Sequence, residues 1–473
     1  MKDDYASTRH RAAAVILCLL LLFIGSGTVL ADLRVTHVME SPVFSSTSDE
    51  VELVFTQQIH YSDVPYIRVH FSDCSLGQRS YMTITSSADG GEQYHDGESL
   101  ANYSNYSAYF NGSEVTLELY VAPGDAGIYV KTDELLVGEW GEKASKERSQ
   151  SALSLCGGDD RLPWGDSRIG RWVGTGGERG TAFIICNGAL VTAGHNWTGG
   201  ETGFEPHDRF LNGLIEFNVP PSLWDGTVQH PPPVDQYAID PSNDTGAFVM
   251  NIVCDIPGYP PDEDAWAGGD WAVFSCLRNS NPPYLKPIQA QEYFYRVTQE
   301  VPAASDMIRV SGYGMDAGEY NYTQKTDMGP FVAEFSQGVN FWNQYQVDTK
   351  GGDSGAPVVR SDNGFAIGVH VDKGCAEGCG GNYGTSFNMK YLANVLEDFP
   401  GEYTKYVDQT PIVSPSTGSI FAPYQTIAAA TGSVGSGWTF SIVKGTYPEN
   451  IRLGDYNKRI ILTAPVGTVR IGQ

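Results

Sequence analysis

The sequence has little positive charge, few charged residues of either sign and few cysteines. Lys and Arg number 30 against 56 Asp and Glu, and the resulting formal charge of −26 disfavours nucleic acid and anionic membranes as partners. Charged residues make up only 18% of the chain, whereas Gly (54), Tyr (26) and Pro (26) are abundant. That mixture is typical of strands and turns, so the composition predicts an all-β protein. Zinc-ligand spacings, phosphate-binding loops and dinucleotide fingerprints are absent as well, and we therefore expect no metal and no cofactor.

Only one stretch of the chain is long and apolar, and it lies near the N-terminus. Arg9, His10 and Arg11 precede an apolar run over residues 12–24, and small residues follow as far as Ala31. These three regions form the pattern of a secretory signal peptide, which predicts that residues 1–31 are removed. A membrane anchor is the alternative, but the run is shorter than the roughly 20 apolar residues that a span requires. The mature chain is therefore expected to be secreted, without a membrane partner.

The cysteines are expected to form disulfides, because an exported protein folds in an oxidising environment. Eight are present, and removal of Cys18 with the signal peptide leaves seven, an odd number that cannot all pair within the chain. Two candidate pairings are a local bridge between Cys375 and Cys379 and a longer one between Cys254 and Cys276.

The 473 residues are enough for two or three domains, and the pattern divides them into four segments after the signal peptide. Short runs with apolar residues at every second position fill residues 32–140, which predicts the antiparallel strands of a small β-sandwich. Residues 141–152 are polar and lack a strand pattern, so they are predicted to be a linker. Residues 153–407 contain further short strands and the motifs described below. Residues 411–473 form a tail rich in Ser, Gly, Thr and Ala.

The two flanking segments resemble known modules. In the sandwich segment, residues 70–73 before a short strand and a Gly-Ile-Tyr-Val-Lys strand at residues 127–131 resemble CUB-like domains. This resemblance implies an accessory recognition module, and a folding or inhibitory prosegment is the alternative. In the tail, residues 423–427, 445–451 and 460–465 resemble the opening coil of right-handed β-helix proteins of the pectin-lyase type. One coil cannot bury its own face, so the tail is expected to dock on the preceding domain, to cap another element, or to reflect a coding sequence that ends early.

A glycine-rich motif predicts a nucleophile. Residues 351–357, Gly-Gly-Asp-Ser-Gly-Ala-Pro, place Ser354 in a turn tight enough to expose its hydroxyl. A serine activated by a neighbouring base is a nucleophile of acyl transfer. Gly352 matters because its amide must point, with that of Ser354, toward the reacting oxygen, and a side chain would obstruct that backbone geometry. Gly352 and Ser354 are therefore predicted to form an oxyanion hole.

A histidine and an aspartate upstream complete the groups that peptide hydrolysis requires. His195 follows an apolar strand and a small-residue turn, and Asp270 follows two glycines and enters the apolar run of residues 271–274. A carboxylate there would be buried beside the imidazole, hold its tautomer and stabilise its charged form. The interval also holds four other acidic candidates: Asp235, Asp240, Asp244 and Asp255. They lack a strand immediately after them, which makes Asp270 the preferred residue.

These motifs, in the order His, Asp, Ser, resemble the chymotrypsin-like serine proteases over roughly residues 157–406. The order excludes the subtilisin and α/β-hydrolase arrangements. The resemblance implies an acyl-enzyme mechanism with His195, Asp270 and Ser354 as its triad, and protein or peptide substrates. The predicted fold class is thus all-β: a two-barrel chymotrypsin-like protease domain preceded by the small β-sandwich and followed by a short β-rich tail. One departure is a missing disulfide around the histidine, since Thr181 and Asn196 lie where many members carry its two cysteines.

The same resemblance points to a substrate pocket. In this fold the pocket is walled by the segment before the nucleophile, residues 346–350, and by the strand of residues 367–372. Thr349 and His370 fall where glutamyl endopeptidases of this class bind the substrate carboxylate, which implies cleavage after Glu or Asp. Physically, a hydroxyl and a ring N–H can both donate to an anion. Asp348 falls where trypsin-like enzymes attract Arg or Lys, so cleavage after basic residues is the alternative.

The motifs leave activation and two other functions open. Asp353 precedes the nucleophile, as in family members in which a new N-terminal amine pairs with this aspartate after zymogen cleavage. A cut after Arg168 would free Ile169 to supply that amine, although the usual Val-Gly-Gly continuation is absent. The two rival functions are a non-catalytic binding or adhesion protein on a protease scaffold, and polysaccharide binding or cleavage through the tail. The intact triad argues against the first, and the lack of a catalytic carboxylate cluster on a complete solenoid argues against the second.

Overall fold

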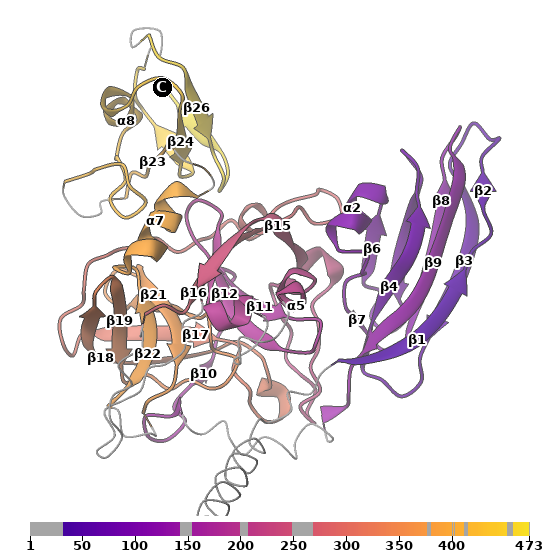
Figure 1. The fold of residues 1–473 in the computed structure, drawn as a ribbon, viewed down its shortest axis with the longest axis horizontal. Coiled ribbons are helices and arrows are strands. Elements are labelled where there is room, and N and C mark those ends of the chain that lie inside the picture. Colours follow the sequence, from indigo (N-terminus) through magenta and orange to yellow (C-terminus); the bar gives the residue numbers. More distant parts are fainter. Residues whose placement is uncertain are drawn as a thin grey trace, which may run out of the picture.

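The structure, a computed structural model, contains a β-sandwich, a central pair of barrels and a C-terminal segment (Figure 1). It describes residues 32–141, 154–198, 207–247, 268–375, 380–399, 401, 403–410, 415–451 and 457–472. The predicted signal peptide, all but the first residue of the predicted linker, Cys254 and Cys379 lie outside these residues. None of the helices in the described ranges combines the length and the apolar composition needed to cross a bilayer.

The N-terminal unit is the predicted sandwich of two antiparallel sheets. One sheet has the order β1-β9-β4-β7 with β2 paired to β9, and the other has the order β3-β8-β5-β6. The elements are β1 Leu33–Glu40, β2 Phe44–Ser45, β3 Glu52–His60, β4 Tyr66–Ser75, β5 Tyr81–Ser86, β6 Glu92–His95, helix α2 Gly97–Asn102, β7 Phe110–Asn111, β8 Glu114–Val121 and β9 Ala126–Val137. Every second residue of β8 is buried, as the apolar alternation predicted, and Leu117 packs with Val69 and Val130 of the opposite sheet. The sandwich therefore has a core of its own.

Two six-stranded antiparallel barrels follow. The first closes in the order β11-β12-β13-β16-β15-β14, and the second runs β18-β17-β20-β21-β22-β19 and closes through β18–β19, with β10 added beside β18. The strands are β10 Leu162–Pro163, β11 Ile169–Val173, β12 Arg179–Ile184, β13 Leu190–Thr192, β14 Leu214–Glu216, β15 Gln236–Ala247, β16 Trp271–Cys276, β17 Met307–Gly312, β18 Lys325–Gln337, β19 Asn340–Tyr345, β20 Pro357–Arg360, β21 Ala366–Asp372 and β22 Asn382–Ser386. The short helices are α4 Gly194–Trp197, α5 Asp208–Leu211, η2 Pro233–Asp235, α6 Pro287–Gln291 and η3 Gly318–Tyr320. The predicted all-β, two-barrel chymotrypsin-like fold is confirmed.

The C-terminal segment begins with a helix and continues as parallel strands. Its elements are α7 Lys390–Asp398, β23 Thr404–Val407, α8 Ile427–Ser433, β24 Trp438–Ile442, β25 Gly445–Tyr447, β26 Ile460–Thr463 and β27 Val469–Ile471. The pairs β23–β24, β24–β26 and β25–β27 are all parallel. Strand β23 pairs with β24 of this sheet, although the sequence assigned residues 404–407 to the preceding domain. The likeness to CUB-like and β-helix modules stays a prediction.

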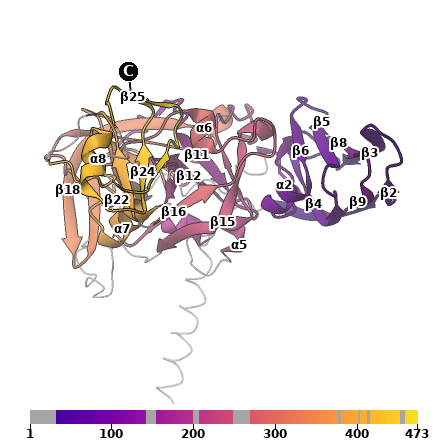
Figure 2. The ribbon, with the colours of Figure 1, turned by 90° about the horizontal axis from the view of Figure 1, so that it is seen from above.

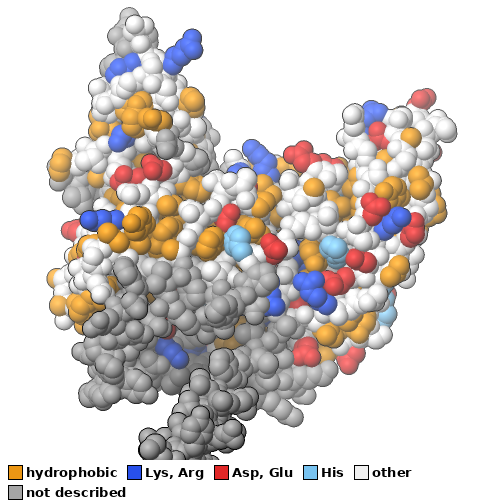
Figure 3. Space-filling view, viewed as in Figure 1, with side chains coloured by type: hydrophobic (Ala, Val, Ile, Leu, Met, Phe, Trp, Pro, Cys, Tyr) orange, Lys and Arg blue, Asp and Glu red, His pale blue; other side chains and the backbone are white. Residues whose placement is uncertain are grey.

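The flanking units lie at different places on the barrels. Figures 1 and 2 show the sandwich beside the first barrel, and the C-terminal segment adjoining α7 and the upper side of the barrels. In the space-filling view, the outline of the molecule is hollowed between these two projections, and Lys and Arg side chains on this face are scattered among acidic ones (Figure 3). The candidate site lies where side chains from the two barrels meet.

Candidate active site

His195 lies in the first turn of α4, directly after strand β13. The turn that leads to it is crowded, because a Cβ on Gly194 would collide with the carbonyl oxygen of Ala247. Glycine at this position lets the turn after β13 pack against the end of β15, which places the imidazole at the end of the first barrel. His195 is 8% exposed. The predicted strand, small-residue turn and histidine are therefore present.

Asp270 contacts His195 at two points. Its Oδ2 lies 2.7 Å from His195 Nδ1, and its Oδ1 accepts a hydrogen bond of 2.9 Å from the His195 main-chain N–H. A carboxylate at Nδ1 keeps the proton on that nitrogen and leaves the lone pair on Nε2, the arrangement that a general base requires. Asp270 is held in turn from the second barrel, because Thr385 Oγ1 donates to its carbonyl oxygen at 2.7 Å. The imidazole and its acid partner are thus oriented by both barrels.

The competing aspartates have other partners. Asp240 accepts from Ser242 and Ser275, and Asp235 accepts from Asn218 and Gln291, away from His195. Asp244 lies 2.9 Å from His207 Nε2 and accepts from Trp197 Nε1. Asp255 lies outside the described residues. Strand β15 begins directly after Asp235, so the sequence argument that no strand follows these aspartates was wrong, and the contacts with His195 favour Asp270 instead.

The loop that carries Ser354 is clamped between the two barrels. The carbonyl oxygen of Ser354 accepts from the Thr181 main-chain N–H at 2.8 Å and from Asn196 Nδ2 at 2.9 Å. On its other side, the Gly355 N–H donates to the His370 carbonyl oxygen at 2.7 Å. Gly355 has φ +93°, and a Cβ there would strike the Thr181 carbonyl oxygen, so only glycine fits. Ser354 therefore lies against strand β12, which precedes His195 in the chain, and against helix α4, which carries His195.

The predicted oxyanion donors lie in the same loop. Gly352 has φ +101°, and its carbonyl oxygen accepts from Thr181 Oγ1 at 2.8 Å. Among the described residues, the amides of Gly352 and Ser354 donate to no protein acceptor, so both remain available to a ligand oxygen. No hydrogen bond in this part of the chain joins the Ser354 hydroxyl to His195. Such contacts are often long before a substrate binds.

Thr181 and Asn196 carry a role that the sequence did not reveal. They lie at the two positions that the sequence resemblance assigned to a missing disulfide, and both bind the carbonyl oxygen of Ser354. Asn196 Nδ2 also donates to Thr192 Oγ1 at 3.0 Å. A polar clamp on the nucleophile loop therefore occupies the place of the covalent bond. The simultaneous loss of both cysteine positions was the signal that could have pointed to it.

Asp353 is buried in a cluster of opposite charges. Its Oδ2 lies 3.4 Å from Arg161 Nη1 and accepts from the Lys350 main-chain N–H at 2.8 Å. Arg161 also pairs with Asp316 at 2.7 Å. The Asp353 carboxylate thus has a cationic partner in the uncut chain.

The bond proposed for zymogen cleavage lies at the start of a barrel strand. Ile169 begins β11, is fully buried and pairs with Phe183 of β12. Activation by a cut between Arg168 and Ile169 stays a prediction. N-terminal sequencing of the active form that found this bond intact would eliminate it.

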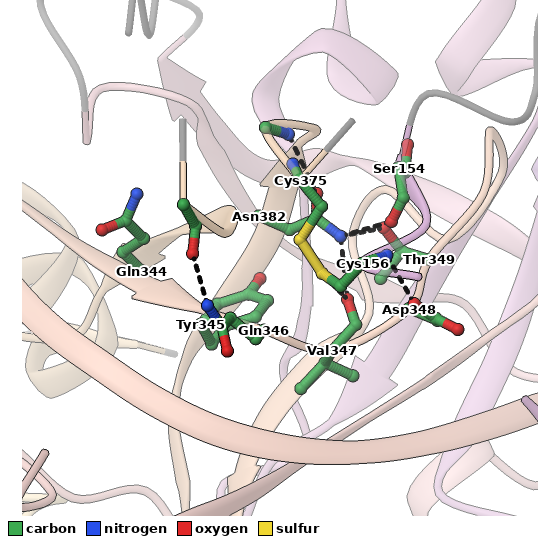
Figure 4. The surroundings of a disulfide bond; sticks show 12 residues. Ser154, Cys156, Gln344, Tyr345, Gln346, Val347, Asp348, Thr349, Cys375 and Asn382 are labelled. Carbon is green, nitrogen blue, oxygen red and sulfur yellow. Dashed lines mark hydrogen bonds between the residues drawn. A yellow bond between two sulfur atoms is a disulfide. The ribbon is translucent and has the colours of Figure 1, made fainter. Parts of the chain in front are cut away.

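The disulfide pattern corrects both predicted pairings. Cys375 bridges Cys156, 219 residues away, with their Cα atoms 4.7 Å apart, so a local bond to Cys379 is wrong (Figure 4). Cys276 is a free, buried cysteine, so its predicted bridge to Cys254 is wrong as well. Local spacing misled because strand β21 and the segment before the first barrel meet only in the tertiary structure. Cys74 and Cys186 are also free, as expected for an odd count.

Asp348 holds the segment around the disulfide in place. Its Oδ1 accepts from the Cys156 N–H at 2.6 Å (Figure 4). Its Oδ2 accepts from the Asp160 N–H at 2.9 Å. Both oxygens are occupied by main-chain donors, and Asp348 is only 5% exposed. Each carboxylate oxygen can accept a second hydrogen bond, so the substrate-binding role of Asp348 stays a prediction. Its next neighbour, Thr349, is fully buried, and its Oγ1 accepts from Asn382 Nδ2 at 3.1 Å.

His370 is buried beside the nucleophile loop. Its Nδ1 lies 2.8 Å from the hydroxyl of Tyr345, which also donates to the Tyr383 carbonyl oxygen at 2.9 Å. Burial, reinforced by the charge of nearby His195, lowers the pKa of His370 to about 3. His370 is therefore neutral near pH 7. Tyr345, which the sequence did not single out, governs which of its ring nitrogens carries the proton.

Among known proteins, only solved structures are similar to this chain, and each of those described below matches about half of it. No protein-family model and no curated protein matches the sequence. A solved Glu endopeptidase, in complex with MPD, is 16% identical with a TM-score of 0.33, and the match covers 50% of this chain and 95% of the endopeptidase. The Rv3671c protease in its inactive form is 13% identical with a TM-score of 0.28, covering 48% of this chain and 89% of the protease. An inactive serine-to-alanine variant of Rv3671c from M. tuberculosis is 12% identical with a TM-score of 0.31, covering 50% and 89%.

Proposed function

We propose that this protein is a secreted serine endopeptidase, with His195 as the base, Asp270 as its orienting acid and Ser354 as the nucleophile. The observation that carries the proposal is the two-point contact of Asp270 with His195, 2.7 Å to Nδ1 and 2.9 Å to the main-chain nitrogen. This contact selects one tautomer and one ring orientation, which a general base needs. The proposal of export rests on the signal-peptide pattern of residues 1–31.

The reaction proceeds through an acyl-enzyme. Nε2 of His195 takes the hydroxyl proton of Ser354 while Oγ attacks the peptide carbonyl carbon, and the amides of Gly352 and Ser354 stabilise the negative oxygen of the tetrahedral intermediate. Breakage of the C–N bond releases the amine, which receives the proton from His195. Water then attacks the ester, His195 takes its proton, and collapse returns that proton to Ser354 as the acid product leaves. Asp270 stays ionised throughout.

We propose cleavage after Glu or Asp, with Thr349 and His370 as donors to the substrate carboxylate. In the structure the Tyr345 hydroxyl donates to the Tyr383 carbonyl oxygen, which leaves the ring proton of His370 on Nδ1. The proposal therefore requires the hydroxyl to turn and donate to Nδ1, so that Nε2 carries the proton and can donate to an anion. Thr349 Oγ1 accepts from Asn382 and still has its own proton to give. The alternative is cleavage after Arg or Lys, in which Asp348 would bind the substrate cation while its two oxygens also accept from main-chain amides.

Covalent labelling tests the proposed nucleophile. A fluorophosphonate probe should label the wild-type chain at Ser354 and leave Ser354→Ala unlabelled. Asp270→Asn should lower kcat by about 10⁴-fold, because an amide partner favours the wrong imidazole tautomer. Asp244→Asn is the matched control, since Asp244 also pairs with a histidine, His207, but outside the proposed site. An unlabelled wild-type chain would favour the non-catalytic binding protein, and equal losses in the two Asp variants would reject the role of Asp270.

A profile of cleaved bonds tests the substrate preference. Peptide libraries should be cut after Glu and Asp, and His370→Gln should raise KM for these substrates. A preference for Arg or Lys in the wild-type enzyme would reject the role given to His370 while leaving the triad intact.

A further inference from the structure

The seam between the sandwich and the first barrel is built from buried hydrogen-bonding side chains. The carboxylate of Asp32, only 6% exposed, accepts from the hydroxyls of Tyr66 and Tyr109, each at 2.8 Å. Arg179, the first residue of β12, donates from Nη2 to the Tyr66 hydroxyl oxygen at 2.9 Å. Tyr66 thus donates to an acid of its own unit and accepts from a cation of the barrel. This hydrogen-bond relay fixes Arg179 relative to the sandwich.

Arg179 leads in turn to the proposed oxyanion loop. Its guanidinium carbon lies 5.3 Å from the ring centroid of Tyr322, within the range of a cation–π contact. The Tyr322 ring lies against Gly352, because a Cβ built there would be 3.1 Å from ring atom Cε1. Tyr322 adopts φ +51°, rare for a non-glycine residue, and is held there by hydrogen bonds to Gly314 and from Arg171. One face of Gly352 is therefore supported by a side chain that Arg179 contacts.

The same strand also reaches the loop directly. Thr181, two residues after Arg179 in β12, donates from its main-chain N–H to Ser354 and from Oγ1 to Gly352. A shift of Arg179 would therefore reach the loop of Gly352 and Ser354 by two routes, through strand β12 and through the Tyr322 ring.

We infer that the sandwich is a positioning part of the active enzyme, and that Arg179 is the residue through which it holds the amide of Gly352 in place. The inference rests on the proposed function and deepens it. An oxyanion donor stabilises the transition state only when it points at the developing charge, and small displacements are costly. Loss of the contact between Tyr66 and Arg179 frees the guanidinium to move away from the Tyr322 ring. The ring then no longer supports Gly352, and the Gly352 amide is no longer held in one orientation. The sandwich then contributes to kcat without touching substrate.

Three seam variants separate this role from mere stability. Arg179→Gln removes the cation, Tyr66→Phe removes the hydroxyl to which Arg179 donates, and Tyr109→Phe is the matched control. Tyr109 also bonds Asp32 and stacks on His230 in the same seam, but it makes no hydrogen bond to Arg179. Each variant is made in the full chain, and kcat, KM and the rate of fluorophosphonate labelling at Ser354 are measured beside thermal stability.

Arg179→Gln and Tyr66→Phe should lower kcat and the labelling rate at least about tenfold with KM within twofold, a fraction of the roughly 10²–10³-fold cost of losing an oxyanion donor. Tyr109→Phe should lose comparable thermal stability and keep kcat within about twofold, because the loop support is intact. Arg179→Lys, which keeps a cation over Tyr322, should recover part of kcat. Tyr66→Phe is nearly isosteric, so it decides the matter if Arg179→Gln fails to fold.

The outcomes distinguish failure of the positioning role from failure of the proposed function. If the wild-type chain is labelled at Ser354 and both Arg179→Gln and Tyr66→Phe keep the kcat of Tyr109→Phe, the positioning role is overturned and the proposed function stands. If the wild-type chain is neither labelled nor hydrolytic, the proposed function fails and this inference fails with it.

Discussion

The C-terminal segment shares an apolar core with the barrels, whereas the N-terminal sandwich keeps its own core and meets the first barrel through tyrosines and polar side chains. Tyr406, Phe421 and Val443 belong to the same buried cluster as the barrel strands. At the other seam, Tyr103 Oη donates to the main-chain oxygen of Gln236, whose side chain pairs with the main chain of Tyr109. Apolar contacts are non-directional, whereas hydrogen bonds set angles. The first seam is held by a shared core, and the second combines a smaller apolar cluster, which includes Val173 and Leu214 of the barrel, with hydrogen bonds that set its orientation.

Truncation in the shared core should have the largest effect on stability. Phe421 is 5% exposed and its ring lies 6.3 Å from that of Phe387. Phe421→Ala should lower the free energy of unfolding by about 3–5 kcal/mol, through lost burial and the cavity left behind, while kcat of the folded fraction is unchanged. Urea unfolding measures the change. Phe335→Ala, at a ring 42% exposed, is the control, and an equal loss in that variant would contradict the shared core.

Removal of a polar contact at the sandwich seam should have the next largest effect. Gln236 is fully buried, and its side chain satisfies both the N–H and the carbonyl of Tyr109. Gln236→Ala should cost about 1–3 kcal/mol, because two buried main-chain groups lose their partners. Unlike Phe421→Ala, it should also change kcat if the sandwich positions the site. The exposed Gln58→Ala is the control for urea unfolding, and a loss at Gln236 no larger than this control would contradict the polar seam.

Acid should weaken the sandwich before it weakens the C-terminal segment. Burial lowers the pKa of His95 to about 3, against the opposing charge of Asp96, and residues 404–472 contain no histidine. Below about pH 6.5 the imidazole of His95 takes up a proton in the unfolded chain but stays neutral in the folded sandwich. The free energy of unfolding therefore decreases as the pH falls, by about 1.4 kcal/mol at one pH unit below 6.5. Hydrogen exchange of the β8 amides at pH 7.5 and 5.5 should register this loss, after correction for the intrinsic exchange rate.

The His95→Gln variant isolates that contribution. Between pH 7.5 and 5.5, the free energy of exchange of the β8 amides should fall by about 1.4 kcal/mol less in this variant than in the wild type. The β24 amides should be unaffected. An unchanged pH dependence in β8 would show that other groups cause the acid response.

Surface ion pairs at the two units should matter least. Lys444 donates to the Glu292 carbonyl oxygen at 2.7 Å, and Lys131 lies 2.9 Å from Glu40, all with partly exposed side chains. Lys444→Ala should change the free energy of unfolding by about 0.5 kcal/mol or less, and Lys131→Ala should leave it unchanged within error, because water screens the charges. The ion pair of Arg296 with Asp408 is a stronger polar contact at the C-terminal seam, so a loss above about 1 kcal/mol at Lys444 would contradict this ranking.

The strands of the sandwich were predictable because their physics is local. Burial at every second residue in β8 follows directly from the apolar alternation of Val115, Leu117 and Leu119. The barrel strands were less distinct, since residues such as those of β16 are buried throughout and show no alternation. Their closure into two barrels came from the resemblance carried by the motifs, and the pairing of β23 with the C-terminal sheet was missed.

The candidate site divides in the same way. His195, Asp270 and Ser354 each lie in a short motif whose turn and strand are set by neighbouring residues, so they could be proposed from sequence. The role of Asp348 stays a prediction, because its place six residues before Ser354 does not reveal that Cys156 and Asp160 supply amides to its two oxygens. Roles that depend on partners far away in the chain are invisible to local pattern.

The sequence by itself determined the residue types, their order and the local turns, because glycine conformations and strand periodicity depend on adjacent residues. Only the tertiary structure decided the 219-residue disulfide, the clamp of Thr181 and Asn196 on Ser354, and the path from the sandwich through Arg179 to the nucleophile loop. These features require separate strands to meet at hydrogen-bond distance. That meeting is decided by the packing of whole barrels and sheets.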